Sequence, residues 1–296
     1  MNLTRNKGKD LKPAMYFNKL EDSKVHCYLC PHNCIINAGN LGVCRARKNI
    51  DGNLYSLNYG KITAIALDPI EKKPLYNFNP GSNILSVGTF GCNLKCSFCQ
   101  NWTIAHDQPE TYDMTPEMLV LKAKELKTKG NIGIAYTYNE PSIWYEFVYE
   151  TAKIAKEQGL LNVLVTNGYI GKEALTQLVP YIDAMNIDVK AYTASFYNDI
   201  CKGALDEVKA TVEQAYNRCH IEITTLVIPT LNDALEEISD MAKWIASLSP
   251  KIPLHLTRYF PNYKMQNIPP TPKETLVRCR EEALKYLDYV YLGNIL

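Results

Sequence analysis

Apolar runs and polar stretches alternate along the chain from residue 84 onward. Seven short segments, most of them apolar runs, predict strands at residues 84–89, 132–138, 161–166, 184–189, 220–227, 253–258 and 288–292. Continuous apolar character is typical of parallel strands whose two faces are both covered. Between the runs, apolar residues recur at helical spacing, as at Leu119, Ala123 and Leu126. The alternation therefore predicts parallel strands joined by helices.

Helix start signals support this interpretation. Thr115 followed by Pro116 predicts a capped helix start, and Pro141 opens a second helix. The segment Thr271-Pro272-Lys273-Glu274 predicts a capping box. Six or seven strand–helix units with right-handed crossovers form a full or partial (β/α) barrel. The fold class we expect is α/β, a partial barrel whose site lies at the carboxyl ends of the strands.

The chain before residue 84 has a different character. We expect two domains, a Cys-rich segment with a connecting arm at residues 1–83 and the barrel at residues 84–296. Residues 62–67 resemble a strand. Residues 68–81 contain three prolines and a glycine, which prevent regular structure. This arm is expected either to lie over the barrel or to be a plain linker.

Seven of the ten cysteines fall into two groups, and clustered thiols in a reducing compartment favour metal binding. The remaining three, Cys201, Cys219 and Cys279, are interpreted as small apolar residues. The first group, spaced C-x2-C-x3-C-x9-C, predicts a zinc site or a second iron–sulfur cluster, between which the spacing does not choose. Its members are Cys27, Cys30, Cys34 and Cys44. The neighbouring His26 and His32 are expected to be surface residues.

The second group, Cys92, Cys96 and Cys99, has the spacing C-x3-C-x2-C and follows a predicted strand. A cubane cluster needs four ligands, and thiolates are its usual protein ligands. Three thiolates in one compact loop leave the fourth iron open, and an open position distinguishes a reactive metal site from a sealed one. A three-cysteine zinc loop or inert thiols are the alternatives.

Polar residues end several predicted strands, where a barrel places its site. Asn139 and Glu140 follow the second strand, and Asn167 follows the third. Asp188 and Lys190 share one face of the fourth, where charge is costly unless it is paired or bound. His255 and Arg258 lie on the sixth strand and are further candidates. Structural alternatives are a cap of the following helix for Glu140 and an ion pair for Asp188 and Lys190.

The overall composition limits the classes of partner. The net charge is +1, so no global field favours nucleic acid or a membrane. The chain is 46% hydrophobic, and none of its apolar runs approaches the roughly 20 residues of a membrane span. The polar, lightly basic start, Met1 to Lys12, lacks the apolar core of a signal peptide. We therefore expect a cytoplasmic protein.

The motif Cys92 to Cys99, with the aromatic Phe98 before its last cysteine, resembles the radical S-adenosylmethionine (SAM) signature. The wider set of motifs is similar to the radical SAM enzymes of the AmmeMemoRadiSam system, which are also labelled homologues of pyruvate formate-lyase activating enzyme. These motifs are the N-terminal cysteine knuckle, Asp68-Pro69-Ile70-Glu71-Lys72-Lys73-Pro74-Leu75, Cys92 through Trp102, Tyr138-Asn139-Glu140-Pro141, and His255-Leu256-Thr257-Arg258-Tyr259-Phe260-Pro261.

The resemblance implies a [4Fe-4S] cluster held by the three loop cysteines and a fourth iron chelated by SAM. It implies that Phe98 packs beside the adenine and that Glu140, Asp188 and Lys190 position SAM, with Asn139 standing in for a glycine of the family's Gly-Gly-Glu-Pro stretch. A flavodoxin- or ferredoxin-like protein would supply the electron. A Memo-like protein is the implied partner.

Three functions follow as hypotheses. The first is SAM cleavage to a 5′-deoxyadenosyl radical that acts on an unidentified substrate of that system. The second is activation of a glycyl-radical enzyme, although short activases resemble only the part after residue 84. The third is a metal-binding scaffold or redox sensor without catalysis.

Overall fold

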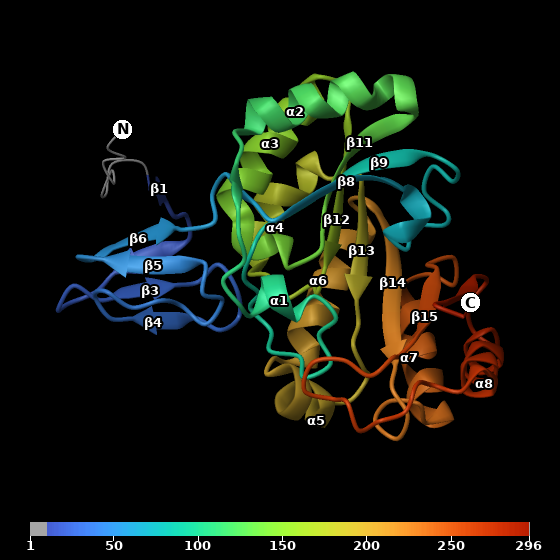
Figure 1. Cartoon of the computed structure of the whole chain (residues 1–296). Coiled ribbons are helices and arrows are strands. Elements are labelled where there is room, and N and C mark those ends of the chain that lie inside the picture. The colour runs from blue at the N-terminus through green and yellow to red at the C-terminus, as the bar shows by residue number, and fades with distance from the viewer. Residues whose placement is uncertain (1–10, 296) are drawn as a thin grey trace.

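The computed structural model of the chain describes residues 11–295 (Figure 1). The prediction about the polar start of the chain therefore lies almost wholly outside the described residues. Within residues 11–295 no helix is both long and apolar enough to cross a bilayer.

Eight strands form one sheet in the order β16-β15-β14-β13-β12-β11-β9-β8. Seven run parallel, and β8 at one edge pairs antiparallel with β9. The bounds are β8 Ala64–Pro69, β9 Asn83–Gly88, β11 Asn131–Tyr136, β12 Leu161–Thr166, β13 Ala184–Asp188, β14 His220–Val227, β15 Leu254–Arg258 and β16 Val290–Gly293. All seven predicted strands are confirmed to within two residues at each end. The predicted α/β partial barrel is also confirmed, with β8 and β16 as its two edges.

Helices connect the parallel strands and alternate with them along the chain (Figure 1). Thr115 caps α2 as predicted, because its side chain accepts a hydrogen bond from the Met118 N–H. The helices are α1 Trp102–Ala105, α2 Pro116–Glu125, α3 Tyr145–Glu157, α4 Lys172–Leu178, α5 Ala194–Phe196, α6 Leu205–Tyr216, α7 Leu235–Leu248 and α8 Lys273–Ala283, with a 3-10 turn Pro141–Trp144 before α3 and a π-helical turn Tyr197–Cys201 after α5.

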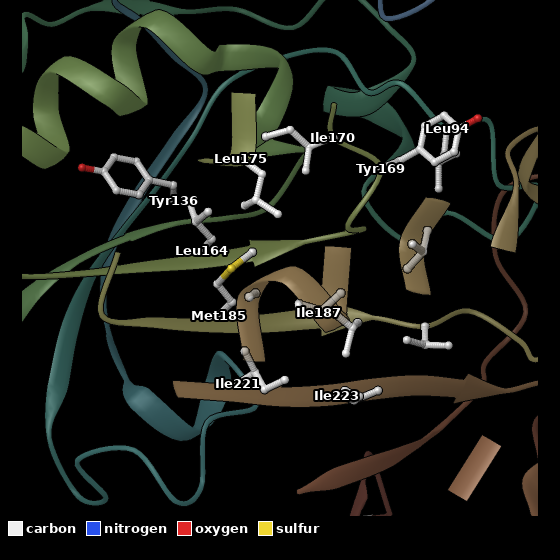
Figure 2. Packing of buried hydrophobic residues seen from close by; sticks show 14 of the residues in the cluster. Leu94, Tyr136, Leu164, Tyr169, Ile170, Leu175, Met185, Ile187, Ile221 and Ile223 are labelled. Atoms are coloured by element: carbon white, nitrogen blue, oxygen red, sulfur yellow. The ribbon is translucent and has the colours of Figure 1, made fainter. Parts of the chain in front are cut away.

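Alternate residues of the strands separate two faces of the sheet. Figure 2 shows Leu164, Met185, Ile187, Ile221 and Ile223 of successive strands packed together beside Leu175 of α4. This apolar face is covered by helices. We call the other the polar face, since it carries polar residues such as Asn186 and Glu222, which point away from their apolar neighbours in the same strands.

The N-terminal strands stand beside the barrel (Figure 1). They form two three-stranded sheets and half of a small two-stranded one, with bounds β1 Lys12–Pro13, β2 Phe17–Lys19, β3 Val25–Cys27, β4 Cys34–Ile36, β5 Arg47–Ile50, β6 Asn53–Ser56, β7 Lys61–Ile62 and its partner β10 Tyr112–Asp113. A buried ion pair at 2.5 Å joins Arg47 to Glu146 of α3. The Glu146 carboxylate also accepts from the Met15 N–H at 2.8 Å. These contacts fix the segment against α3.

The arm at residues 68–81 crosses the polar face of the sheet, so the plain-linker alternative is wrong. The Asn186 side-chain amide donates to the Pro74 carbonyl at 2.8 Å. The Tyr76 and Asn77 N–H groups donate to the Glu222 carboxylate. Leu75 and Ile70 of the arm are buried in a cluster that includes Ala135 and Ala184 of the sheet. The arm therefore fills one end of the barrel interior.

Two details differ from the sequence predictions. Thr271 does not make a capping box, because its hydroxyl donates to the Val227 carbonyl and accepts from the Tyr259 N–H, so α8 begins without a side-chain cap. The sheet begins at Ala64, ahead of residue 84, since β8 adds to the free edge of β9. The division into domains at residue 84 stays a prediction.

Candidate active site

The loop after β9 carries Cys92, Cys96 and Cys99 to the carboxyl end of the sheet. Gly91 precedes it with a φ of +91°, a conformation that favours glycine, and a Cβ there would lie 2.7 Å from the Cys44 carbonyl oxygen. The Asn139 amide donates to the Gly91 carbonyl at 2.9 Å, and its oxygen accepts from the Thr89 N–H. The loop is thus held at its start by one residue of the neighbouring strand end.

A cavity of about 400 Å³ lies at this end of the sheet. The three loop cysteines line it together with six of the other predicted residues, namely Phe98, Asn139, Glu140, Asn167, Asp188 and Lys190. These residues come from the loop and from the ends of β11, β12 and β13. Residues distant in sequence therefore meet at one site, as the barrel geometry predicts.

Glu140 is a buried carboxylate that already serves the fold. It accepts from the Ser142 N–H at 2.9 Å, from the Thr166 hydroxyl at 2.7 Å and from the Asn167 N–H at 2.7 Å. The helix-cap alternative is therefore correct, because Glu140 caps the turn that begins at Pro141. Because a carboxylate has about four acceptor positions, one remains for a ligand that lies in the cavity. Burial raises the pKa of this carboxyl, although the three donors oppose the shift.

Two asparagines tie the cysteine loop to the end of β12. The Asn167 amide donates to the Asn93 side-chain oxygen at 3.0 Å and lies 3.6 Å from the Cys92 Sγ. The Asn93 amide in turn donates to the Tyr169 carbonyl at 2.6 Å. Asn93 was not among the residues selected from the sequence. It is buried within the loop and orients Asn167 toward Cys92.

Asp188 at the end of β13 and Lys190 just after it form an ion pair at 2.6 Å and line the cavity. Burial lowers the pKa of Lys190, but the adjacent Asp188 outweighs it and the net shift is upward. Both side chains keep some exposure to the cavity. The pair is therefore a structural ion pair that also presents polar atoms to a ligand.

The three loop thiols differ in their surroundings. Exclusion of water raises the pKa of Cys99 to about 11 and the pKa of Cys92 well above its ordinary value of 9. The pKa of Cys96 is lowered, because the buried Cys201 thiol donates a hydrogen bond to its sulfur. Thiolates are the metal-binding form, so loading this loop releases protons.

Among residues 11–295, no three His, Cys, Asp or Glu side chains converge on a point where one metal ion would sit. In a cubane cluster each thiolate binds a different iron. The loop's all-thiol donors around one cavity therefore fit a [4Fe-4S] cluster, and the nearby carboxylate, amide and ammonium groups fit the polar groups of SAM.

His255 and Arg258 do not line the cavity. His255 is buried and donates to the Glu222 carboxylate at 2.6 Å. Arg258 donates from Nε to the Thr271 carbonyl at 2.7 Å and stacks on Phe260. Both side chains are engaged in the fold, and a role for either in binding the cofactor stays a prediction.

The N-terminal cysteines lie close to one another and next to the active loop. Cys27 and Cys34 face each other across β3 and β4. Burial, with the other thiols nearby, raises the pKa of Cys30 to about 12 and that of Cys44 to about 11. The described side chains do not converge on a single ion here either. A metal at this knuckle stays a prediction.

His32 of the same knuckle contacts the active loop and is not a free surface residue. Its Nε2 lies 2.6 Å from the Asn93 carbonyl oxygen, and its ring packs against Tyr169. The N-terminal segment therefore supports the loop that carries Cys92 and Cys96.

Residues of the arm and of β14 that the sequence does not single out also line the cavity. They include Lys72, Lys73, Pro74 and Thr224, with Tyr138 beside them. Two adjacent lysines between prolines were visible in the sequence as an unusual charged stretch. Their place under the active loop depends on how the arm folds back, which no local pattern reports.

Comparison with known proteins gives the family. The model described as "Radical SAM superfamily" matches residues 86–245. An uncharacterised protein of Methanocaldococcus jannaschii, MJ0808, is 44% identical over 292 residues, which are 96% of this chain and 86% of that protein. The pyruvate formate-lyase-activating enzyme of Clostridium pasteurianum is 27% identical over 228 residues, which are 70% of this chain and 91% of that enzyme.

Solved structures show the same fold. SuiB of Streptococcus suis bound to S-adenosylmethionine has a TM-score of 0.57 at 13% identity, over 71% of this chain and 51% of SuiB. A radical SAM methyltransferase from Sphaerobacter thermophilus has a TM-score of 0.54 at 15% identity, over 73% of this chain and 67% of that protein. With the cysteine loop at the mouth of a partial barrel, these findings show that the chain belongs to the radical SAM superfamily.

Proposed function

We propose that this protein binds a [4Fe-4S] cluster through Cys92, Cys96 and Cys99 and cleaves SAM reductively. The observation that carries the proposal is the single cavity that joins these thiols to Glu140 and Lys190. These residues would hold a cluster that supplies one electron, taken from an external donor, for cleavage of the C5′–S bond of SAM to methionine and a 5′-deoxyadenosyl radical.

The chain's own residues would hold SAM in place. The remaining acceptor position of Glu140 suits the SAM ammonium, because a carboxylate is its natural partner. Lys190 and Asp188 would hold the carboxylate and ribose hydroxyls. Phe98, which is buried at the cavity wall, would pack beside the adenine. The arm and the sheet together exclude bulk water from the site.

Anaerobic reconstitution tests the proposal. The wild type should bind about four iron and four sulfide per loop cluster, the composition of the cubane. It should form 5′-deoxyadenosine from SAM on reduction with dithionite. The variant with Cys92, Cys96 and Cys99 all changed to Ala should lose the iron and sulfide of the loop cluster and form no deoxyadenosine, whereas Cys219→Ala, at an isolated position, should behave as wild type. Deoxyadenosine from the triple variant would refute the proposal. A wild type that binds the cluster without cleaving SAM would indicate a scaffold or redox sensor.

Activation of a glycyl-radical enzyme is a second candidate, favoured by the likeness to the Clostridium pasteurianum activating enzyme. The test is to add a candidate glycyl-radical enzyme and look for a protein-centred radical by electron paramagnetic resonance. A flavodoxin or ferredoxin is the electron donor we expect. An assignment to the AmmeMemoRadiSam system, with a Memo-like partner, rests on the sequence motifs and is tested by co-purification.

The N-terminal knuckle is proposed to bind zinc or a second cluster through Cys27, Cys30, Cys34 and Cys44. Its support is the grouping of four thiols within one short segment against the active loop. Iron, sulfide and zinc analysis of the triple loop variant separates the two sites. Zinc retained by that variant identifies a structural site, and iron with sulfide identifies a cluster.

A further inference from the structure

The arm contributes a buried ammonium group to the cavity. Lys73 lines it and is only 4% exposed. Its Nζ donates to Asp68 Oδ2 at 3.0 Å and lies 4.8 Å from the centre of the Tyr138 ring. A buried charge of this kind is costly unless it is paired and its hydrogen-bond donors are satisfied.

Lys73 has donors that the fold does not use. An ammonium group has three N–H donors, and among the described residues only the Asp68 carboxylate accepts from this one. The Tyr138 ring faces another side of the ammonium as a cation–π partner. At least one N–H is therefore left for an acceptor that enters the cavity.

A second unsatisfied group lines the same cavity. The Thr224 hydroxyl of β14 is buried and has no hydrogen-bond partner among the described residues. A buried hydroxyl is normally paired, because leaving it unpaired loses its bonds to water without replacement. Lys73 of the arm and Thr224 of β14 therefore both have an unused hydrogen-bond donor in the same cavity.

The partner of Lys73 lies outside the cavity. Asp68 pairs with Lys73 at 3.0 Å but is not among the residues that line the cavity, so the ammonium group is the member of the pair that faces it. An acceptor that carries a negative charge makes a stronger hydrogen bond to an ammonium group than a neutral acceptor does. The free donor of Lys73 therefore favours an anionic ligand.

The local backbone holds this arrangement in place. Tyr138, which follows β11, has a φ of +70° although it is not glycine. Its hydroxyl donates to Asp68 Oδ2 at 3.0 Å, and its ring lies against Lys73. Strained backbone conformations of this kind cluster at ligand sites, where surrounding contacts maintain them.

We propose that Lys73 and Thr224 form a subsite for the negatively charged group of the substrate, a small molecule that carries a carboxylate or phosphate. This inference rests on the proposed function, because the anion would be held beside the place where the SAM-derived radical forms. It names a substrate class distinct from a glycyl-radical loop, which presents neutral backbone and has no need of a buried ammonium.

Isothermal titration calorimetry of anaerobically reconstituted protein, saturated with SAM and left unreduced, tests the subsite. Acetate, pyruvate and inorganic phosphate are the probes. The wild type should bind at least one of them. Lys73→Met should weaken that binding by about ten- to a hundredfold, the loss typical of one charge-assisted hydrogen bond. Lys127→Met, at an exposed position, is the matched control and should bind as wild type.

Two further variants separate a binding role from a structural one. Asp68→Asn keeps the shape but removes a negative charge, so anion binding should strengthen. Thr224→Val should weaken it by about three- to tenfold, less than Lys73→Met, because a hydroxyl is an uncharged donor. A merely structural Lys73–Asp68 pair would instead make Asp68→Asn bind no better than wild type.

Three outcomes overturn the subsite. They are a wild type that binds none of the probes, an Asp68→Asn variant that binds them no more tightly, and a Lys73→Met variant whose affinity for SAM falls as far as its affinity for the anion. The last would assign Lys73 to SAM. Failure of the proposed function is seen separately, as absence of SAM cleavage by the wild type.

Discussion

Glu222→Gln tests the energetic role of the arm that carries Lys73. The Glu222 carboxylate has no exposed surface. It accepts from the Tyr76 and Asn77 N–H groups at 3.0 and 2.8 Å, and from His255 and His220 at 2.6 and 3.0 Å. Four donors from the arm and two strands therefore converge on one carboxylate. Glutamine has the same shape but brings donors of its own to a site that already contains only donors.

The contribution of Glu222 to the free energy of unfolding follows from the pKa of this carboxyl. Burial raises it, but hydrogen bonds from the two histidines and the arm outweigh burial and hold the pKa of Glu222 at about 2, against an ordinary value of 4.5. Since one pKa unit corresponds to about 1.4 kcal/mol, ionised Glu222 stabilises the fold by about 3 kcal/mol at pH 7. The folded-state pKa is the lower one, so this stabilisation is complete above pH 4.5 and is lost as the pH falls toward 2.

Urea denaturation of the wild type and Glu222→Gln at several pH values measures this contribution to stability. We expect the variant to be less stable by about 3 kcal/mol at pH 7 and at pH 5, with the difference narrowing between pH 4.5 and 3. Glu281→Gln, at an exposed position on α8, should be neutral throughout. A difference below about 1 kcal/mol at pH 7, or one that stays constant down to pH 3, would contradict the reasoning.

Three other substitutions probe the supports of the site. Arg47→Met should cost about 3–5 kcal/mol in denaturant unfolding, because it leaves the buried Glu146 unpaired, and the double variant with Glu146→Leu should cost less than the single one. Gly91→Ala should lower the iron content after reconstitution, since its Cβ would collide with the Cys44 carbonyl at a φ of +91°; wild-type iron content would argue that the loop tolerates a shift. Asn139→Leu removes the two bonds that hold the start of the loop and should reduce stability by about 1–3 kcal/mol in thermal unfolding, and an unchanged midpoint would mean that the loop is held without it.

Much of the barrel was predictable because its signals are local. Strands such as 132–138 are largely apolar runs, and both faces of a parallel strand are buried, so burial is recorded within a few residues of sequence. The cysteine loop was likewise visible, since the ligands of a cluster must be supplied from a short segment with fixed spacing. The polar residues that end the strands could be gathered from the barrel rule alone.

Other features could not be predicted from local sequence. His255 and Arg258 have the residue types of a binding site, but their partners, Glu222 and the Thr271 carbonyl, come from other elements. Thr271 has the sequence of a helix cap, yet a buried carbonyl at Val227 is the acceptor that it satisfies. In each case a distant partner outweighs the local preference.

The sequence alone thus determined the alternation of strands and helices, the position of the cysteine loop and the polar residues at the strand ends. Only the tertiary structure decided that the arm folds back across the sheet and brings Lys73 against Tyr138 and into the cavity that Thr224 also lines. The physical reason is range. Periodicity and ligand spacing act over a few residues, whereas the pairing of a buried charge depends on which distant groups the closed fold brings within hydrogen-bond distance.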